Sequence, residues 1–271
     1  MNELKYSFSE HSLSEIATQV DQETITYFKD KFKSNEKLLA EYTLCITGTI
    51  GAGKSTLCES LVYTIQTAFP DINIHAFPEY LSVYPEISNR MLSLRLDGTI
   101  SIGTFQSYIL DIWQNMASKA PHTPGFRIFE RCADDCVIGF ANAANKDNAL
   151  SDQMLHTLYQ RVRTLDDEYK LPTYFNDTKF TEIKSSNINY NMCQIADIIA
   201  SDISNNVFNR IIGLSVSTFD SDRRIKQRNR DGETAYTIEM LTSFNDHYTK
   251  LFALLSAHEN LTRFVDIGKL Y

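Results

Sequence analysis

"ITGTIGAGKSTLCES" (residues 46–60) is the stretch of this 271-residue chain that decides its fold. It contains the pattern G-x-x-x-x-G-K-S, with the fixed positions at Gly48, Gly53, Lys54 and Ser55. The apolar run "YTLCITG" comes just before the loop, and a helical pattern follows it. A glycine-rich turn between a strand and a helix aims backbone N–H groups at phosphate oxygens, and the helix dipole adds positive potential. The stretch therefore predicts a cradle for the phosphates of a nucleoside triphosphate.

The residues of this loop have separate expected tasks. The glycines let the backbone curl around the phosphates, Lys54 reaches the β- and γ-phosphates, and the Ser55 hydroxyl ligates Mg²⁺. We therefore expect the nucleotide and its metal ion to be bound by the loop residues Gly48, Gly51, Gly53, Lys54, Ser55 and Thr56.

The composition is that of an ordinary globular protein, with 43% apolar and 22% charged residues and a net charge of −8. The length favours one α/β domain over two small ones. The acidic balance argues against nucleic acid or an anionic membrane as a partner. No apolar run approaches the ~20 residues that span a bilayer. Five irregularly spaced cysteines suggest no disulfide framework, so we expect a cytoplasmic protein.

Strand patterns alternate with helical ones along the chain, which predicts a central parallel sheet of about five strands with helices on both faces. The expected strands are residues 42–48, 71–77, 126–130, 209–217 and 263–267. Residues 1–40 are expected to form an N-terminal helical extension, with a helix over 23–42, and residues 41–271 the nucleotide-binding domain. The polar, Asn-rich segment 171–208 gives no clear pattern and is interpreted as a possible insertion.

Two other classes of nucleotide-binding protein fit the sequence poorly. A GTPase reads guanine with Asn-Lys-x-Asp, but the nearest candidate, "NKDN" (145–148), has its acid one place early. Motor and transport ATPases end an apolar strand in Asp-Glu, and neither "RIIGLSVS" nor "RFVDIG" does so. "FRIFER" instead ends in Glu130 and Arg131. An acid at a strand's carboxyl end followed by arginine is typical of a small-molecule kinase.

Five segments occur in the order, and at roughly the spacing, of the deoxynucleoside kinase family: "ITGTIGAGKSTL", "FPEY", "TFQSY", "FERCADD" and "RRIKQRNRDGE". The chain resembles that family over about residues 42–250, apart from 171–208. The resemblance implies a P-loop kinase fold with an arginine-rich lid, ATP and Mg²⁺ as cofactors, a homodimer, and a role in nucleotide salvage for DNA precursor synthesis.

The resemblance also implies catalytic roles. Glu79 would accept the proton of the 5′-OH as a general base, with Tyr80 replacing the second proline of the family's Pro-Glu-Pro pattern. Glu130 would hold Mg²⁺ through water. Arg131 would bind the 5′ oxygen and the transferring phosphoryl group and oppose the charge of Glu79. Cys132 stands where the family has serine.

The basic segment 223–230, with five cationic residues in eight, corresponds to the lid. Its arginines would close over ATP and neutralise charge during transfer; the matching positions are Arg224, Arg228 and Arg230. Glu233 corresponds to the lid carboxylate that binds the sugar 3′-OH.

The substrate pocket carries both matches and departures. Gln106 corresponds to the glutamine whose amide pairs with the base, and Phe105 to an aromatic residue near the base. Four positions differ from the family pattern: Tyr84 replaces tryptophan, Arg95 tyrosine, Trp113 arginine and Cys136 aspartate. A different nucleoside, or a different acceptor, is therefore expected.

The sequence thus predicts an enzyme that transfers the γ-phosphoryl group of ATP to the 5′-OH of a deoxynucleoside. One alternative is a nucleoside monophosphate kinase of the thymidylate kinase type, which Arg95 keeps open as an extra cation near the acceptor. Another is a nucleotide-binding protein descended from a kinase that has lost its chemistry. The intact set Lys54, Ser55, Glu79 and Arg131 argues against the latter.

Overall fold

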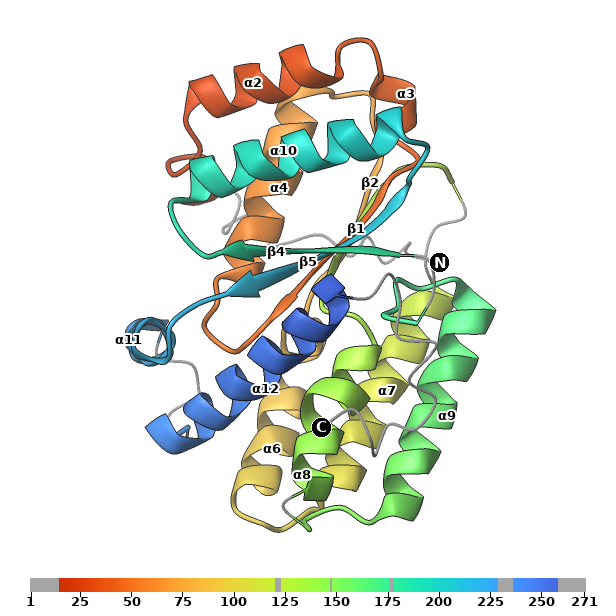
Figure 1. Ribbon diagram of the computed structural model, residues 1–271, viewed down its shortest axis with the longest axis vertical. Helices are drawn as coiled ribbons and strands as arrows, with labels where there is room; N and C mark the ends of the chain where they lie inside the picture. The colour runs from red at the N-terminus through yellow and green to blue at the C-terminus, as the bar shows by residue number, and fades with distance from the viewer. Residues whose placement is uncertain (1–14, 120–122, 147, 176–177, 229–235, 258–271) are drawn as a thin grey trace.

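The computed structural model describes residues 15–119, 123–146, 148–175, 178–228 and 236–257 (Figure 1). One sheet of five strands runs through the molecule, in the order β2-β3-β1-β5-β4, and every neighbouring pair is parallel. The strands are β1 (Thr43–Gly48), β2 (Ile74–Phe77), β3 (Phe126–Glu130), β4 (Lys179–Lys184) and β5 (Asn209–Ser215). The predicted fold class, a parallel α/β sheet around a phosphate-binding loop, is confirmed.

Helices cover both faces of this sheet, because parallel strands joined by crossovers must bury both sides. In Figure 1, α2, α4 and α10 lie on one face, and α7, α9 and α12 lie on the other. The helices are α2 (Gln22–Phe32), α3 (Glu36–Leu39), α4 (Lys54–Ala68), α5 (Tyr80–Val83), α6 (Pro85–Leu96), α7 (Ile102–Ser118), the π-helix η1 (Asp135–Ala141), α8 (Asn142–Lys146), α9 (Asp152–Tyr169), α10 (Ile188–Ser204), α11 (Thr218–Arg228) and α12 (Ile238–Ala257).

Polar side chains begin several of these helices. Asp21, Ser101 and Ser151 each accept a hydrogen bond from a backbone N–H in the first turn of α2, α7 and α9, respectively. Such a cap satisfies a donor that has no partner within the helix and contributes about 1 kcal/mol.

The core consists of two layers separated by the sheet. Strand β1 supplies both, since successive side chains point to opposite faces: Leu44 and Ile46 pack with α2, α4 and α10, whereas Cys45 packs with Phe77 and Phe129 on the other side. The rings of Phe77 and Phe129 stack with their centroids 4.2 Å apart, in register across β2 and β3. This stack fixes the ends of two strands whose following residues enter the site.

One expected helix differs in the structure. The helix expected over 23–42 is broken: α2 ends at Phe32 and α3 begins at Glu36. Phe28 and Phe32 of α2 are fully buried in the layer that contains α4 and α10.

The segment 171–208, whose pattern was unclear, provides the edge strand β4 and the covering helix α10. Strand β4 is mostly polar because it lies at the edge of the sheet, where only one of its six side chains is buried. The strand expected over 263–267 lies outside the described residues.

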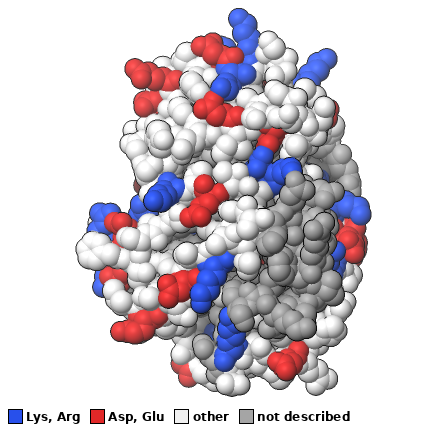
Figure 2. Space-filling view, in the orientation of Figure 1, with Lys and Arg blue, Asp and Glu red and all other residues white. Residues whose placement is uncertain are grey.

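The face drawn in Figure 2 carries lysine, arginine, aspartate and glutamate side chains interspersed with one another. Within the ranges that the structure describes, no helix combines the length and apolarity needed to cross a membrane.

Two aspartates are buried where η1 approaches the inner face of α9. Asp134 is 0% exposed and Asp166 is 1% exposed. The backbone N–H of Tyr174 donates to one oxygen of Asp134 over 2.7 Å. Burial is the main cause that raises the pKa of Asp134 to about 6 and that of Asp166 to about 9; the charge of Asp135 adds to the shift at Asp134, and the charge of Asp134 adds to the shift at Asp166. At neutral pH, Asp166 is therefore protonated.

This pair gives a prediction for stability. The pKa of Asp166 is higher in the folded protein than its ordinary value of 3.8. Its contribution to folding stability is therefore complete below pH 3.8 and is lost as pH rises through about 9. Asp166→Asn needs no proton, so the variant should melt higher than the wild type at pH 8, by about 2 °C or more, and this gain should shrink at pH 5. Melting curves at both pH values test this.

Glu168→Gln, at an exposed position on the same helix, is the matched control and should show no such pH-dependent gain. A gain for Asp166→Asn that is equal at pH 5 and pH 8 would contradict a buried, protonated Asp166.

Candidate functional site

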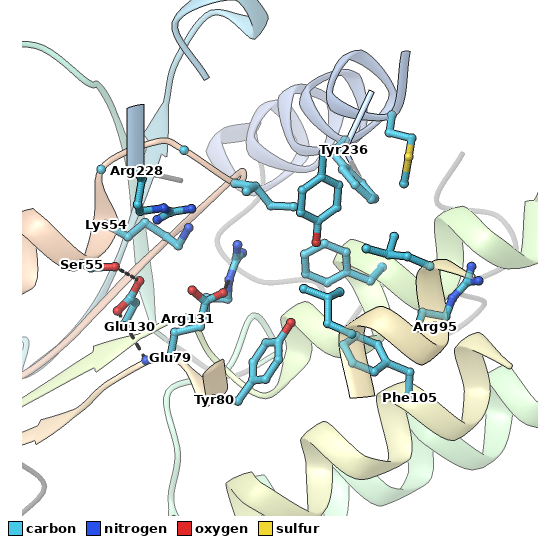
Figure 3. Close-up of a pocket in the computed structure, with 18 of the residues that line it drawn as sticks. Lys54, Ser55, Glu79, Tyr80, Arg95, Phe105, Glu130, Arg131, Arg228 and Tyr236 are labelled. Carbon is cyan, nitrogen blue, oxygen red and sulfur yellow. Dashed lines mark hydrogen bonds and ion pairs between the residues drawn. The ribbon is translucent and has the colours of Figure 1, made fainter. Parts of the chain in front are cut away.

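A cavity of about 370 Å³ lies at the carboxyl ends of β1, β2 and β3. Ligands of open α/β sheets bind at this edge, outside the strand ends. Figure 3 shows Lys54 and Ser55 at one end, Arg95 and Phe105 at the other, and Glu79 and Arg131 between them. The phosphate loop and the predicted acceptor-side residues therefore line one continuous space.

The loop has the backbone conformation that its glycines allow. Gly48 has φ 138°, and a Cβ there would lie 2.3 Å from the carbonyl oxygen of Leu214 on β5. Gly53 has φ 93° and precedes the first residue of α4. Both φ values fall in a region that side chains with a Cβ rarely adopt. Gly51, Gly53, Ser55 and Thr56 line the cavity beside the start of α4.

Lys54 is buried, with 5% exposure, and its Nζ donates to the carbonyl oxygen of Thr49 within the loop over 2.9 Å. Burial, followed by the charge of Arg131, lowers the pKa of Lys54 to about 8. The ammonium is thus a cation held in a poorly solvated place. A phosphate group bound in the loop would add negative charge beside this ammonium and favour its charged form.

Ser55 and Glu130 form an oxygen pair next to the loop. The Ser55 hydroxyl donates to Glu130 Oε1 over 2.7 Å, and the backbone N–H of Glu79 points to Oε2 at 3.4 Å. Glu130 is 2% exposed, and burial, followed by the charge of Glu79, raises its pKa. A cation at this position would offset both causes.

The donor set fits Mg²⁺, which binds through one or two protein oxygens and takes its other ligands from phosphates and water. Within the described ranges, no group of three or more His, Cys, Asp or Glu side chains could hold a metal ion without such help. Ser55 and Glu130 would therefore hold Mg²⁺ only together with a phosphate ligand.

Glu79 and Arg131 form an ion pair in the middle of the cavity. Arg131 Nε donates to Glu79 Oε1 over 2.9 Å, and the side chains are 5% and 12% exposed for Arg131 and Glu79. Both residues lie just beyond strand ends: Glu79 is the second residue after β2, and Arg131 directly follows β3. A carboxylate oxygen is thus fixed within the same space as Lys54, although the two residues are separated by 25 positions in sequence.

On the acceptor side, α7 contributes Phe105 and Gln106. The ring of Tyr80 meets that of Phe105 edge-on, with centroids 6.1 Å apart. Gln106 is 1% exposed, and its Oε1 has no hydrogen-bond partner among the described residues. A buried acceptor without a donor costs about 1–3 kcal/mol, and an N–H group of a bound ligand would supply the missing donor.

Of three further predicted site residues, Tyr84 and Arg224 do not line the cavity, whereas Arg228 does. The Tyr84 hydroxyl accepts from the Asn115 amide at 2.5 Å, and Tyr84 packs against the core. Arg224 donates to the carbonyl oxygens of Gly51 and Ala52, and so braces the loop from outside the cavity. Arg228 lines the cavity.

Some of the remaining positions contact the loop or the core instead of the cavity. The carbonyl oxygen of Gly48 accepts from Arg131. Trp113 and Cys136, the expected departures, are both buried in the core. Arg230 and Glu233 lie outside the described residues.

Sequence reasoning missed the residues that close the cavity from the side of α12: Tyr236, Met240 and Phe244. Met240 and Phe244 lie four positions apart on α12, which puts them on one helical face, and this spacing was the available signal; Tyr236 precedes the helix. Phe140 of η1 and Leu92, Leu96 and Ile102 complete the apolar wall. The acceptor side is therefore mainly apolar and aromatic, with Gln106 as its buried amide.

The sheet and the loop together define an α/β protein of the P-loop class. No family model and no curated protein matches the chain. Similar solved structures include deoxyadenosine kinase from M. mycoides with bound dCTP, at 19% identity and TM-score 0.48, covering 79% of this chain and 85% of that one.

The same enzyme with bound dATP gives 20% identity and TM-score 0.48, covering 78% of this chain and 84% of that one. With its products bound, that enzyme gives 18% identity and TM-score 0.48, covering 84% of this chain and 93% of that one. These values are too low to assign an activity to this chain.

The buried ammonium gives a prediction that needs no ligand. The pKa of Lys54 is about 8 in the folded protein, below its ordinary value of 10.5, so the charged amine lowers the free energy of unfolding. This loss of stability is complete below pH 8 and disappears as pH rises to 10.5. Lys54→Met should therefore melt higher than the wild type at pH 7. The gain should fall by roughly 1.4 kcal/mol of unfolding free energy per pH unit between these values.

Lys33→Met, at an exposed position, is the control and should show no pH-dependent difference. A gain for Lys54→Met that persists undiminished at pH 10 would mean that the buried charge is not its cause.

Proposed function

We propose that this protein transfers the γ-phosphoryl group of ATP to the 5′-hydroxyl of a deoxynucleoside. The observation that carries the proposal is the position of the Glu79–Arg131 pair, which lies between the phosphate loop and the acceptor end of one cavity. A proton acceptor and a cation at this point suit transfer to a hydroxyl group.

The cavity has a donor end and an acceptor end. ATP would bind with its phosphates against Lys54, Ser55 and Thr56, where the loop N–H groups and the start of α4 favour negative charge. The nucleoside would lie between Tyr80 and Phe105, with its base against Gln106. The amide offers one acceptor and two donors, which matches the edge of a nucleobase.

In the proposed step, the 5′ oxygen bonds to the γ-phosphorus as the bond to the β–γ bridging oxygen breaks. Glu79 takes the proton of the attacking hydroxyl, and ADP leaves with the bridging oxygen. Arg131 and Lys54 oppose the negative charge on the transferring group, and Arg228 approaches the cavity from α11. Mg²⁺, held through Ser55 and Glu130 with the phosphates, would neutralise charge on the β- and γ-oxygens.

The test is a panel of deoxynucleosides and their monophosphates incubated with ATP, repeated with Glu79→Gln. We expect a 5′-monophosphate to form from a nucleoside, and kcat to fall roughly 10²–10⁴-fold in the variant, because the amide cannot take the proton. The melting temperature should change little.

Glu86→Gln, an exposed position on α6, is the control and should keep the wild-type rate. Turnover of monophosphates alone would favour the second candidate below. ATP binding without turnover of any acceptor would favour a nucleotide-binding protein without catalysis.

A nucleoside monophosphate kinase is the second candidate, because Arg95 lines the acceptor end of the cavity. Among the described residues, no carboxylate pairs with its guanidinium. An arginine in such a place suits an anionic group on the acceptor.

Arg95→Ala separates the two candidates, with Arg90→Ala, an exposed position on the same helix, as the control. If the acceptor is a monophosphate, kcat/KM for it should fall roughly 10- to 100-fold in Arg95→Ala, as expected for a lost hydrogen bond to a charged group. If the acceptor is a nucleoside, both variants should keep the wild-type preference for nucleoside over monophosphate in a competition assay.

A further inference from the structure

Behind the cavity, the Arg131 guanidinium is held by a backbone carbonyl oxygen and by a tyrosine hydroxyl. Its Nη1 donates to the carbonyl oxygen of Gly48 over 2.7 Å and to the hydroxyl of Tyr248, on α12, over 2.8 Å. Its Nε donates to Glu79. A guanidinium has five N–H groups. Three are thus used by the protein, and the two on Nη2 have no partner among the described residues.

The Tyr248 hydroxyl has its direction set by Asp135. It donates to Asp135 Oδ1 over 2.8 Å, and both residues are 1% exposed. Because a hydroxyl has a single hydrogen, donation to the carboxylate leaves its lone pairs for Arg131. Burial, followed by the charge of Asp135, raises the pKa of Tyr248 well above its ordinary value, so the hydroxyl keeps this proton.

Asp135 is itself held from three other sides. The Thr47 hydroxyl lies 2.9 Å from both of its oxygens, the Tyr174 hydroxyl donates to Oδ1 over 2.9 Å, and the backbone N–H of Cys132 donates to Oδ2 over 3.0 Å. A fully satisfied buried network of this kind is rigid. It connects the end of β1, the turn after β3 and helix α12.

The surrounding backbone is shaped for the same contact. Arg131 has φ 73°, an uncommon value for a residue with a side chain, which persists where neighbouring contacts hold it. At Gly139 of η1, an added Cβ would lie 3.0 Å from the Tyr248 hydroxyl oxygen. The missing side chain there leaves room for the hydroxyl.

We propose that Tyr248, oriented by Asp135, is a positioning residue for Arg131, holding its guanidinium so that Nε meets Glu79 while Nη2 faces the transferring phosphoryl group. This inference rests on the proposed function for its kinetic consequence. The role is indirect, because Tyr248 does not line the main cavity.

Tyr248→Phe and Tyr174→Phe form a matched pair that tests the proposal. Each removes a buried hydroxyl that donates to Asp135 Oδ1, at 2.8 and 2.9 Å, but only Tyr248 also accepts from Arg131. We expect similar losses of melting temperature. Only Tyr248→Phe should lower kcat, roughly ten- to hundredfold, with KM for ATP changed less than about threefold.

Equal kcat losses in the two variants, or no loss in Tyr248→Phe, would overturn the proposal. If Tyr248→Phe does not fold, Gly139→Ala replaces it, because its Cβ crowds the hydroxyl while Tyr248 stays; a fall in kcat is again the supporting result and an unchanged kcat the opposing one.

A second readout does not depend on activity. The Nε–H resonance of Arg131 in a ¹H–¹⁵N spectrum, identified by its disappearance in Arg131→Lys, should shift or broaden in Tyr248→Phe and stay in place in Tyr174→Phe. If the wild type phosphorylates no acceptor, the proposed function fails, and this spectrum still decides the inference: an unmoved resonance in Tyr248→Phe would refute it.

Discussion

The buried guanidinium of Arg131 is the interaction on which the rest of the site depends. A cation taken out of water must have its hydrogen bonds supplied by the protein, since an uncompensated buried charge is strongly destabilising. Here the partners come from the ends of two strands and from a helix: Glu79 after β2, the Gly48 carbonyl at the end of β1, and Tyr248 on α12. One side chain therefore fixes the distance between the phosphate loop and the carboxylate opposite it.

This arrangement also links local strain to the sheet. The turn after β3 places a non-glycine residue at positive φ, and the ladder between β1 and β3 brings Ile46 into register with Glu130, the residue before it. The strained turn is thus supported by parallel pairing on one side and by Arg131's own hydrogen bonds on the other. The pairing of β1 with β3 and the hydrogen bonds of Arg131 therefore stabilise both the core and the site.

Elements with strong local signals were predictable from the sequence. The loop, α4 and the central strands follow from glycines at fixed spacing and from apolar runs, which depend on nearby residues only. Strand β4 could not be predicted from the sequence. Its residues, "KFTEIK", lie at the sheet edge and bury only Ile183, so the composition of the strand is mostly polar. The break between α2 and α3 was also missed, because residues 33–35 contain neither glycine nor proline.

For the site, motif-borne residues such as Lys54, Glu79 and Gln106 were predicted to share one space, and the structure puts all of them on one cavity; their roles stay predictions. The contacts of Tyr248 could not be predicted, because they join positions 117 and 113 residues apart and exist only after helix α12 packs. Tyr84 shows the converse. Its place in the pattern suggested the pocket, but its hydroxyl pairs with Asn115.

The unpaired oxygen of Gln106 has a consequence for breadth of recognition. Apolar walls discriminate weakly between rings that differ by a methyl group, whereas a buried polar atom strongly rejects a ring that cannot complete its hydrogen bond. Trp113 and Cys136 are buried in the core, and the described part of the acceptor end holds this amide among aromatic side chains. Under the proposed function, a ring bound there would be selected by the donor atom that it presents to Gln106 more than by its outline.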